Sequence, residues 1–341
     1  MNLVFSTVIR SAPLNRCGEV VVLDWDTKKI VTSTYVGPSD PTVRDKNPRG
    51  NTRGGRGIRL GAESIYVACY DKIDVFDNDL ALKRRLSNGL TAGLHETLLT
   101  TPDSVWVAAT ALDAAIEVGL DKGEVRGSYW PRENENFQRD FGLPPGGIDP
   151  SGDYRETFTS ERLGPHPGHL HLNALATYQG EMLALFNRLG AIANLDRGTV
   201  LVRDPELQRG HNLEIVGDQV VTNATRHGEI HVYDLRTGDR ARTIRLRDYE
   251  WVRESIKPTL ASRGLRKVRK TLGRPDLANP LFVRGMDIVG NRLFVGFSPA
   301  AIVCIDLESG KMIDGYQHST DVRECVHGLR VDQRGSSQPS H

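Results

Sequence analysis

The sequence predicts an all-β fold, a six-bladed β-propeller, from three observations: a repeated strand pattern, paired turns within each repeat, and one repeat divided between the chain ends. A short apolar run that ends in Asp occurs six times, as VVVLD, IDVFD, IEVGLD, IANLD, IHVYD and IVCID. Four of these runs continue into a turn that contains glycine. Apolar alternation bounded by Asp and Gly is typical of a β-strand that enters a hairpin.

A second apolar element precedes five of these runs, for example RGIRLGAESIYVA and RGMDIVGNRLFVGF. A polar turn divides each element into two apolar runs, which predicts a second hairpin. Two hairpins form a four-stranded antiparallel sheet, the blade of a propeller. We therefore expect five continuous blades at residues 55–87, 91–130, 169–205, 210–247 and 281–318.

The remaining blade is divided between the two ends of the chain. HGLRVD resembles the first strand of a repeat that then stops, and residues 1–37 supply the other strands. Pairing of residues 323–332 with the amino-terminal strands would close the ring. The sequence thus predicts a single propeller over residues 1–333 and a disordered tail at 334–341.

Three long insertions separate blades, at residues 38–54, 131–168 and 248–280. Each follows the last strand of one blade, so all three are expected on the face where the innermost strands begin. We expect the first to be a loop and the second an ordered lid. In the third, apolar residues at helical spacing around Trp251 and Leu265 predict two short helices. Their basic residues either bind an anionic partner or face the solvent.

The composition argues against several classes of partner. The chain has 44 basic and 43 acidic residues, a formal charge of +1, so no overall field attracts nucleic acid or an anionic membrane. No segment approaches the ~20 apolar residues that span a bilayer. The amino terminus lacks a secretory signal, and the four cysteines are scattered without a CxxC pair. We expect a cytoplasmic protein without nucleic-acid or membrane partners.

A ring of polar residues follows from aligning the six innermost strands at their starts. The aligned residues are Arg56, Glu96, Asn173, His211, Arg284 and His327. Innermost strands run along the central channel, so these positions should meet around the axis. Side chains two positions earlier point the same way, which adds His171 and Cys325, and a bulge would add His95. Burying such groups is costly, so the ring predicts a binding site.

The histidines of the ring suggest a divalent metal. His171, His211 and His327 come from three blades and could present imidazole nitrogens to one ion, Zn²⁺ or Fe²⁺. His95 and Cys325 are further candidate ligands. Three neutral histidines that leave one position open suit an ion that acts as a Lewis acid or generates hydroxide.

The other ring residues suit an anionic substrate. Arg56 and Arg284 present planar donor groups for a carboxylate or phosphate and would stabilise developing negative charge. Glu96 is the candidate general base or a fourth ligand, and Asn173 is a candidate substrate-binding residue. We expect a metal-assisted lyase or hydrolase that acts on a small anionic molecule. Two alternatives stay open: acid–base catalysis by His and Arg without metal, and a non-catalytic propeller that binds a protein, peptide or small ligand.

The blade pattern resembles, over nearly the whole chain, the six-bladed propeller superfamily of strictosidine-synthase-like, gluconolactonase-like and NHL-repeat proteins. This resemblance implies a metal or a His/Glu group at the channel mouth. The gluconolactonase-like members bind a divalent ion through carboxylate and asparagine ligands, and only Glu96 and Asn173 would match that set.

The proposed pocket is also similar to the amidating-lyase propeller, which uses three histidines on a metal beside an arginine. The resemblance would give His171, His211 and His327 the part of the ligands. Arg56 or Arg284 would take the part of the arginine. That family is secreted and disulfide-bonded, and this chain shows neither sign, so its substrate is not carried over.

Overall fold

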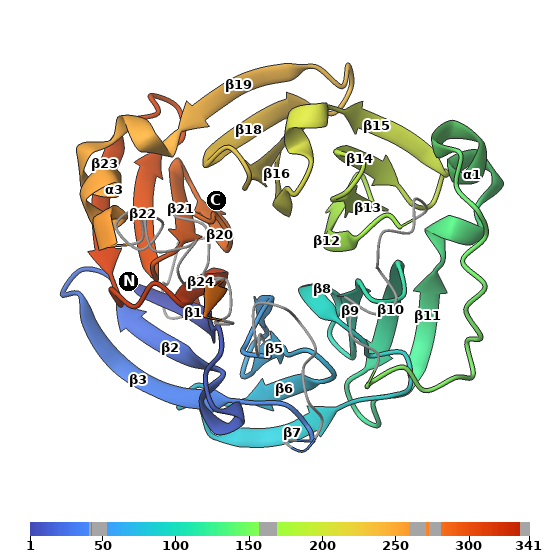
Figure 1. Ribbon diagram of the computed structural model, residues 1–341, viewed down its shortest axis with the longest axis horizontal. Coiled ribbons are helices and arrows are strands. Elements are labelled where there is room, and N and C mark those ends of the chain that lie inside the picture. The colour runs from blue at the N-terminus through green and yellow to red at the C-terminus, as the bar shows by residue number, and fades with distance from the viewer. Residues whose placement is uncertain (41, 43–52, 157–168, 259–270, 273–280, 335–341) are drawn as a thin grey trace.

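Six four-stranded antiparallel sheets surround one axis in the computed structural model (Figure 1), which confirms the six-bladed propeller. The structure describes residues 1–40, 42, 53–156, 169–258, 271–272 and 281–334. In the described residues the fold is almost entirely β, with a few short helices.

The blades are numbered along the chain, with the innermost strand given first. Blade 1 contains β24 (Glu324–Asp332), β1 (Asn2–Ile9), β2 (Gly18–Asp24) and β3 (Lys29–Val36). Blade 2 contains β4 (Ile58–Leu60), β5 (Ile65–Ala68), β6 (Ile73–Phe76) and β7 (Leu82–Leu86). Blade 3 contains β8 (Leu94–Thr101), β9 (Ser104–Ala109), β10 (Ala114–Gly119) and β11 (Val125–Tyr129).

The other three blades repeat this order. Blade 4 contains β12 (Leu172–Tyr178), β13 (Glu181–Phe186), β14 (Ala191–Asn194) and β15 (Thr199–Arg203). Blade 5 contains β16 (His211–Val216), β17 (Gln219–Ala224), β18 (Glu229–Asp234) and β19 (Arg240–Arg245). Blade 6 contains β20 (Met286–Val289), β21 (Arg292–Phe297), β22 (Ala301–Asp306) and β23 (Met312–Gln317).

The ring closes within blade 1, as predicted. Strand β1 pairs antiparallel with β24, from Asn2 opposite Asp332 to Ile9 opposite Glu324. The last strand of the chain therefore lies innermost in the blade whose other three strands begin the chain (Figure 1).

The core consists of six apolar clusters, each between two neighbouring blades. The repeated run that ends in Asp forms the third strand of every blade. Both faces of that strand are covered by neighbouring blades, so β22 is buried at all positions except Asp306. Apolar residues on both faces are what a strand inside stacked sheets requires.

Short helices occupy the described parts of the insertions. Helix α1 (Glu135–Phe141) buries Phe137 between blades 3 and 4, although no helix was expected there. Helix α3 (Glu250–Ser255) buries Val252 between blades 5 and 6 and confirms the first of the two helices predicted in the third insertion. The 3-10 turns are η1 (Leu14–Arg16), η2 (Pro131–Glu133), η3 (Pro205–Leu207) and η4 (Leu246–Asp248).

Other predictions lie outside the described residues. These are the second helix around Leu265, most of the first insertion, and the tail beyond Arg334. None of the helices in the described ranges is long and apolar enough to cross a membrane. All four cysteines are buried free thiols.

Candidate functional site

Four innermost strands carry an irregularity near the start, where the predicted ring residues lie. The pairing of β8 with β9 shifts between Leu94 and Thr97, and that of β16 with β17 shifts between His211 and Glu214. Equivalent shifts occur in β12 and β24. A bulge re-aims side chains that regular alternation would place on opposite faces. His95 and Glu96, neighbours in sequence, are therefore both buried near the axis.

Four histidines meet around the axis. The ring centroid of His95 lies 5.4 Å from that of His171, 6.3 Å from that of His211 and 5.7 Å from that of His327. The strand that carries His95 contains the bulge that was expected to bring this residue to the axis. Its ring lies among the other three.

Two arginines join the histidines. The guanidinium of Arg284 donates to Nε2 of His327. The Nη1 atom of Arg56 donates to the carbonyl of Leu94 at 2.7 Å and lies 3.3 Å from Nδ1 of His95. We call the six residues together the axial cluster: Arg56, His95, His171, His211, Arg284 and His327.

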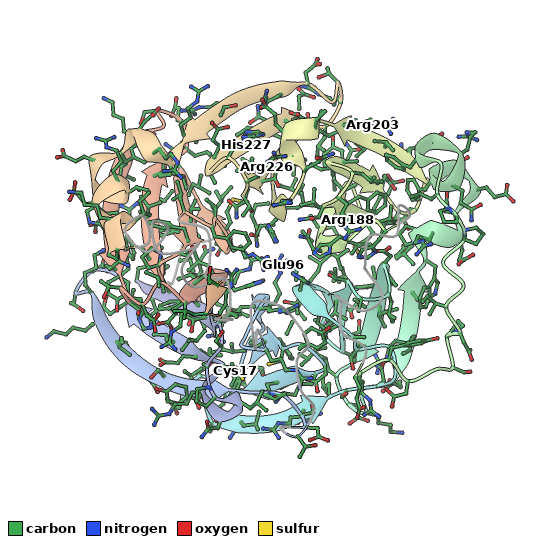
Figure 2. The ribbon with its side chains drawn as sticks, viewed as in Figure 1. Cys17, Glu96, Arg188, Arg203, Arg226 and His227 are labelled. Carbon is green, nitrogen blue, oxygen red and sulfur yellow. The ribbon has the colours of Figure 1, made fainter. Side chains whose placement is uncertain are left out.

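Glu96 lies at the centre of the ring of blades (Figure 2). Its Oε1 accepts a hydrogen bond of 3.0 Å from Asn212. Asn212 has a left-handed backbone, with φ of 59°, and its side-chain oxygen accepts from Asn223 at 2.8 Å. This asparagine layer was not predicted, because Asn212 follows His211 directly and regular alternation would turn it away from the axis.

Two predicted residues bind backbone carbonyls instead. Asn173 donates to the carbonyl of Gly210 at 3.0 Å, between blades 4 and 5. The thiol of Cys325 donates to the carbonyl of Val8 at 3.8 Å, within blade 1. The expectation that residues two apart share a face assumed a regular strand, whereas both β12 and β24 are irregular here.

Close approach of neighbouring innermost strands explains the glycine after several ring residues. The amide of Gly57 donates to the carbonyl of His95 at 2.7 Å. A Cβ on Gly57 would lie 2.5 Å from that oxygen, and one on Gly328 would lie 2.0 Å from the carbonyl of Arg56. Glycine therefore lets adjacent blades bring their ring side chains together.

The histidines of the axial cluster are neutral near pH 7. Burial is the main cause that lowers the pKa of His95, His171, His211 and His327 well below 6.5, and nearby arginines act in the same direction. Burial also raises the pKa of Glu96 to about 7, although Arg59, Arg284 and the hydrogen bond from Asn212 oppose the shift. The positive charge at the axis is thus carried by guanidinium groups, while the imidazoles contribute dipoles and lone pairs.

The cluster is divided by charge. Arg284, His327 and Arg56 come from the consecutive blades 6, 1 and 2. His95, His171 and His211 come from blades 3, 4 and 5. One half of the ring is therefore cationic and the other half consists of neutral imidazoles.

Asp113 and His169 support the site, and neither was among the predicted site residues. Asp113 lies in the turn between β9 and β10 and is buried with φ of 57°. Its carboxylate accepts from the amides of Leu170 at 3.0 Å and His171 at 2.8 Å, and also from Nδ1 of His169. These bonds fix the segment that carries His171. Nothing in the sequence around Asp113 indicates this role, since its partners lie more than fifty residues away.

The predicted metal centre does not fit the side chains as they are placed. Across the described ranges, no three His, Cys, Asp or Glu side chains are arranged to hold a metal ion. The ring of His95 lies among the predicted ligands, and Nε2 of His327 accepts from Arg284. The presence of a metal stays a prediction.

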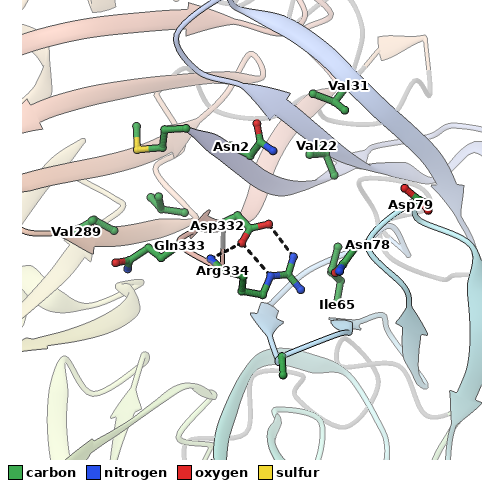
Figure 3. A pocket seen from close by; sticks show the side chains of 13 residues that line it. Asn2, Val22, Val31, Ile65, Asn78, Asp79, Val289, Asp332, Gln333 and Arg334 are labelled. Atoms are coloured by element: carbon green, nitrogen blue, oxygen red, sulfur yellow. Dashed lines mark hydrogen bonds and ion pairs between the residues drawn. The ribbon is translucent and has the colours of Figure 1, made fainter. Parts of the chain in front are cut away.

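A separate cavity of about 890 Å³ lies at the far end of β24 (Figure 3). Asn2, Ile65, Val331 and other residues of mixed polarity line it. The guanidinium of Arg334 in this cavity binds the carboxylate of Asp332 at 2.8 Å. No predicted ring residue lines this cavity.

No family model and no curated protein sequence matches the chain. Solved structures share its fold. A protein of unknown function from Bacteroides caccae is 11% identical, with a TM-score of 0.55 over 96% of this chain and 97% of that one. A chain of the nidogen/laminin complex is 10% identical, with a TM-score of 0.54 over the same shares. At these identities the likeness shows the propeller fold alone.

Proposed function

We propose that the protein is an enzyme of lyase or hydrolase type that acts on a small molecule bearing a carboxylate or phosphate, bound at the axial cluster. The observation that supports this proposal is the convergence of two guanidinium groups, four neutral imidazoles and Glu96 in one group, all of it buried except His171 and Arg284, which are partly buried. Burying such groups is costly, and perturbed pKa values gather at functional sites.

Arg56 and Arg284 bind the anionic group in this proposal. They flank His327 in the ring, and Arg284 donates directly to that imidazole. Each guanidinium is also held by an aromatic ring, Arg284 over Phe282 at 4.5 Å and Arg56 over Tyr70 at 5.1 Å. Planar donors fixed in this way suit a carboxylate or phosphate.

Glu96 is the residue that takes a proton from the substrate or gives one to it. A carboxyl group with a pKa of about 7 exists in both protonation states at neutral pH, which suits a general acid or base. Its hydrogen bond from Asn212 holds the carboxyl group in place. Arg284 is close enough to oppose the shift of the Glu96 pKa, so one arginine contacts both parts of the site electrostatically.

A divalent ion at His171, His211 and His327 belongs to the proposal as an untested part, as does the likeness to the metal-dependent propeller families. When bound, such an ion would polarise the substrate and lower the pKa of a bound water. Elemental analysis of the purified protein tests it. An ion bound there predicts near-stoichiometric Zn or Fe in the natural protein and loss of that metal in the double variant His211→Ala/His327→Ala. Equal metal content in both proteins would contradict the metal.

Calorimetric titration with succinate and inorganic phosphate tests the anion site. We expect Arg284→Gln and Arg56→Gln each to weaken binding by at least about tenfold, because each removes one charged donor pair. Arg245→Gln is the matched control, since it removes an equal charge from an outer strand where the side chain is 65% exposed. Unchanged affinity in Arg284→Gln, or no binding by the natural protein, would refute the site.

Turnover separates an enzyme from a binding protein. Hydrolysis of p-nitrophenyl phosphate should fall by at least about a hundredfold in Glu96→Gln while phosphate affinity is retained, since general acid–base catalysis is worth that much or more. Anion binding without turnover of any phosphate or carboxylate ester would instead support the non-catalytic alternative.

A further inference from the structure

We propose that the ligand of the axial cluster is an acid that also carries a hydroxyl or amino group. Its anionic group binds at Arg56 and Arg284, and its O–H or N–H group donates to Nε2 of His95 or of His211. This inference rests on the proposed function, because it concerns the ligand of the same site.

The hydrogen bonds of Thr225 fix which nitrogen of His211 carries the proton. The hydroxyl of Thr225 donates to the carbonyl of Val283 at 2.8 Å, so its single proton is used. Nδ1 of His211 lies 2.7 Å from the same hydroxyl oxygen and must therefore donate to it. A neutral imidazole has one N–H, which leaves Nε2 as an acceptor. Within the described residues this buried Nε2 has no hydrogen-bond partner.

Thr110 acts on His95 in the same way. Its hydroxyl donates to the carbonyl of Leu172 at 2.5 Å. Nδ1 of His95 lies 2.9 Å from that hydroxyl oxygen and 3.1 Å from the carbonyl of Gly93, and both atoms accept. Both acceptors lie closer to Nδ1 than the donor Nη1 of Arg56, at 3.3 Å, so we assign the proton of His95 to Nδ1, and Nε2 is an acceptor. The two acceptor imidazoles are 6.3 Å apart and tilted by 34°.

His327 has the opposite role. Its Nε2 accepts from Arg284, so Nδ1 carries the proton. That buried N–H has no hydrogen-bond partner in the part of the chain that the structure describes. Blades 6, 1 and 2 therefore offer donors to a ligand, and blades 3 and 5 offer acceptors.

A ligand that is only an anion satisfies the donors of blades 6, 1 and 2 but not the acceptors of blades 3 and 5. Its oxygens accept from the donors, but they place further lone pairs opposite Nε2 of His95 and His211. A buried acceptor without a donor costs about 1 to 3 kcal/mol. Sites built to bond a substrate O–H or N–H therefore discriminate strongly against an analogue that lacks it.

Calorimetric titration of the full chain with succinate, malate and aspartate tests the inference. Malate and aspartate differ from succinate by one hydroxyl or one amino group. We expect at least one of them to bind at least about tenfold more tightly than succinate. The comparison also shows which of the two donor groups the site prefers.

The variant Thr225→Val tests whether the fixed proton of His211 causes the preference for a ligand with a donor group. Valine keeps the shape but removes the acceptor for Nδ1, so His211 is no longer held with a bare Nε2. We expect the preference over succinate to fall several-fold, with succinate affinity unchanged. Thr177→Val, at an exposed position of β12, is the control and should leave the preference intact. If Thr225→Val does not fold, Thr110→Val provides the same test at His95.

The outcomes separate the two proposals. Equal affinity for all three acids would overturn this inference and leave the anion site standing. Binding of none of them would overturn both. A preference that survives in both threonine variants would overturn the role of the fixed imidazoles.

Discussion

The two ends of the innermost strands both carry buried arginines, but these arginines have different partners at each end. At the strand starts, the axial cluster sets two arginines against neutral imidazoles. Farther along the same strands lies an opposite cluster of Arg59, Glu214, Asp287 and Arg330. There Arg330 binds the carboxyl group of Glu214 at 2.7 Å and lies 3.5 Å from that of Asp287. Arg59 lies 3.7 Å from Glu214.

This difference separates a structural cluster from a candidate ligand site. In the opposite cluster the arginines meet carboxyl groups of the protein itself, although burial raises the pKa of Glu214 to about 8 and that of Asp287 to about 6. In the axial cluster the described contacts of the arginines are with imidazoles, a backbone carbonyl and aromatic rings. The imidazole nitrogens of His211 and His327 include atoms without a partner among the described residues. A bound anion with donor groups would complete that arrangement.

Removing one arginine from each cluster should give the largest difference in stability between the two clusters. Arg330→Met leaves the carboxyl groups of Glu214 and Asp287 with Arg59 as their remaining arginine, and we expect it to lower the free energy of unfolding by about 4 kcal/mol. Arg284→Met removes a cation that faces imidazoles, and we expect a loss of about 1 kcal/mol. Denaturant unfolding of both variants at pH 7 checks this. Equal losses would mean that the two clusters do not differ in kind.

Glu96 gives the next largest effect, and it depends on pH. Its pKa is about 7 in the folded protein against an ordinary 4.5, so the unfolded chain ionises first and stability falls as pH rises from 4.5 to 7. Glu96→Gln removes this penalty. We expect it to stabilise the protein by about 3 kcal/mol at pH 8 and by little below pH 4.5.

The half-buried Glu181 is the control for this effect. Its pKa is lowered, mainly by a hydrogen bond from Arg197, so Glu181→Gln should bring no gain at pH 8. Stability of Glu96→Gln that is unchanged between pH 5 and pH 8 relative to the natural protein would contradict the raised pKa.

The histidines give the smallest effect on stability, and their effect has the opposite pH dependence to that of Glu96. Since burial lowers the pKa of His211, the unfolded chain binds a proton below pH 6.5 that the folded protein does not, and stability falls in acid. His211→Gln should reduce this loss by about 1 kcal/mol at pH 5.5. His227→Gln, at an exposed position, serves as the control in the same thermal unfolding series. An identical acid dependence in His211→Gln and the natural protein would show that His211 is protonated when folded.

The fold followed from the sequence because each blade is specified locally. The run IVCID became β22 and IHVYD became β18, since apolar alternation and Asp/Gly turns act within a few residues. The closure of the ring followed from the incomplete repeat HGLRVD, which lies within β24. The residue types at the axis were also visible, because polar residues at every strand start are unusual for a core.

The sequence could not show which further residues of each innermost strand reach the axis, because this depends on bulges. The pairs His211 and Glu214, and His327 and Arg330, lie three residues apart, a spacing that regular alternation would place on opposite faces. The shifts in β16 and β24 bring both members of each pair to the axis. The bond between Asp113 and His169 joins two blades across a long segment, and no local pattern reports such a contact.

The central claim is that neutral imidazoles with fixed protons face the arginines of a ligand site, and ¹⁵N NMR of histidine side chains tests it most directly. At pH 6 we expect His95 and His211 to be neutral with the proton on Nδ1, and their Nε2 signals to shift when malate is added. Protonated rings at pH 6, protons on Nε2, or signals that malate leaves unchanged at saturating concentration would contradict the account.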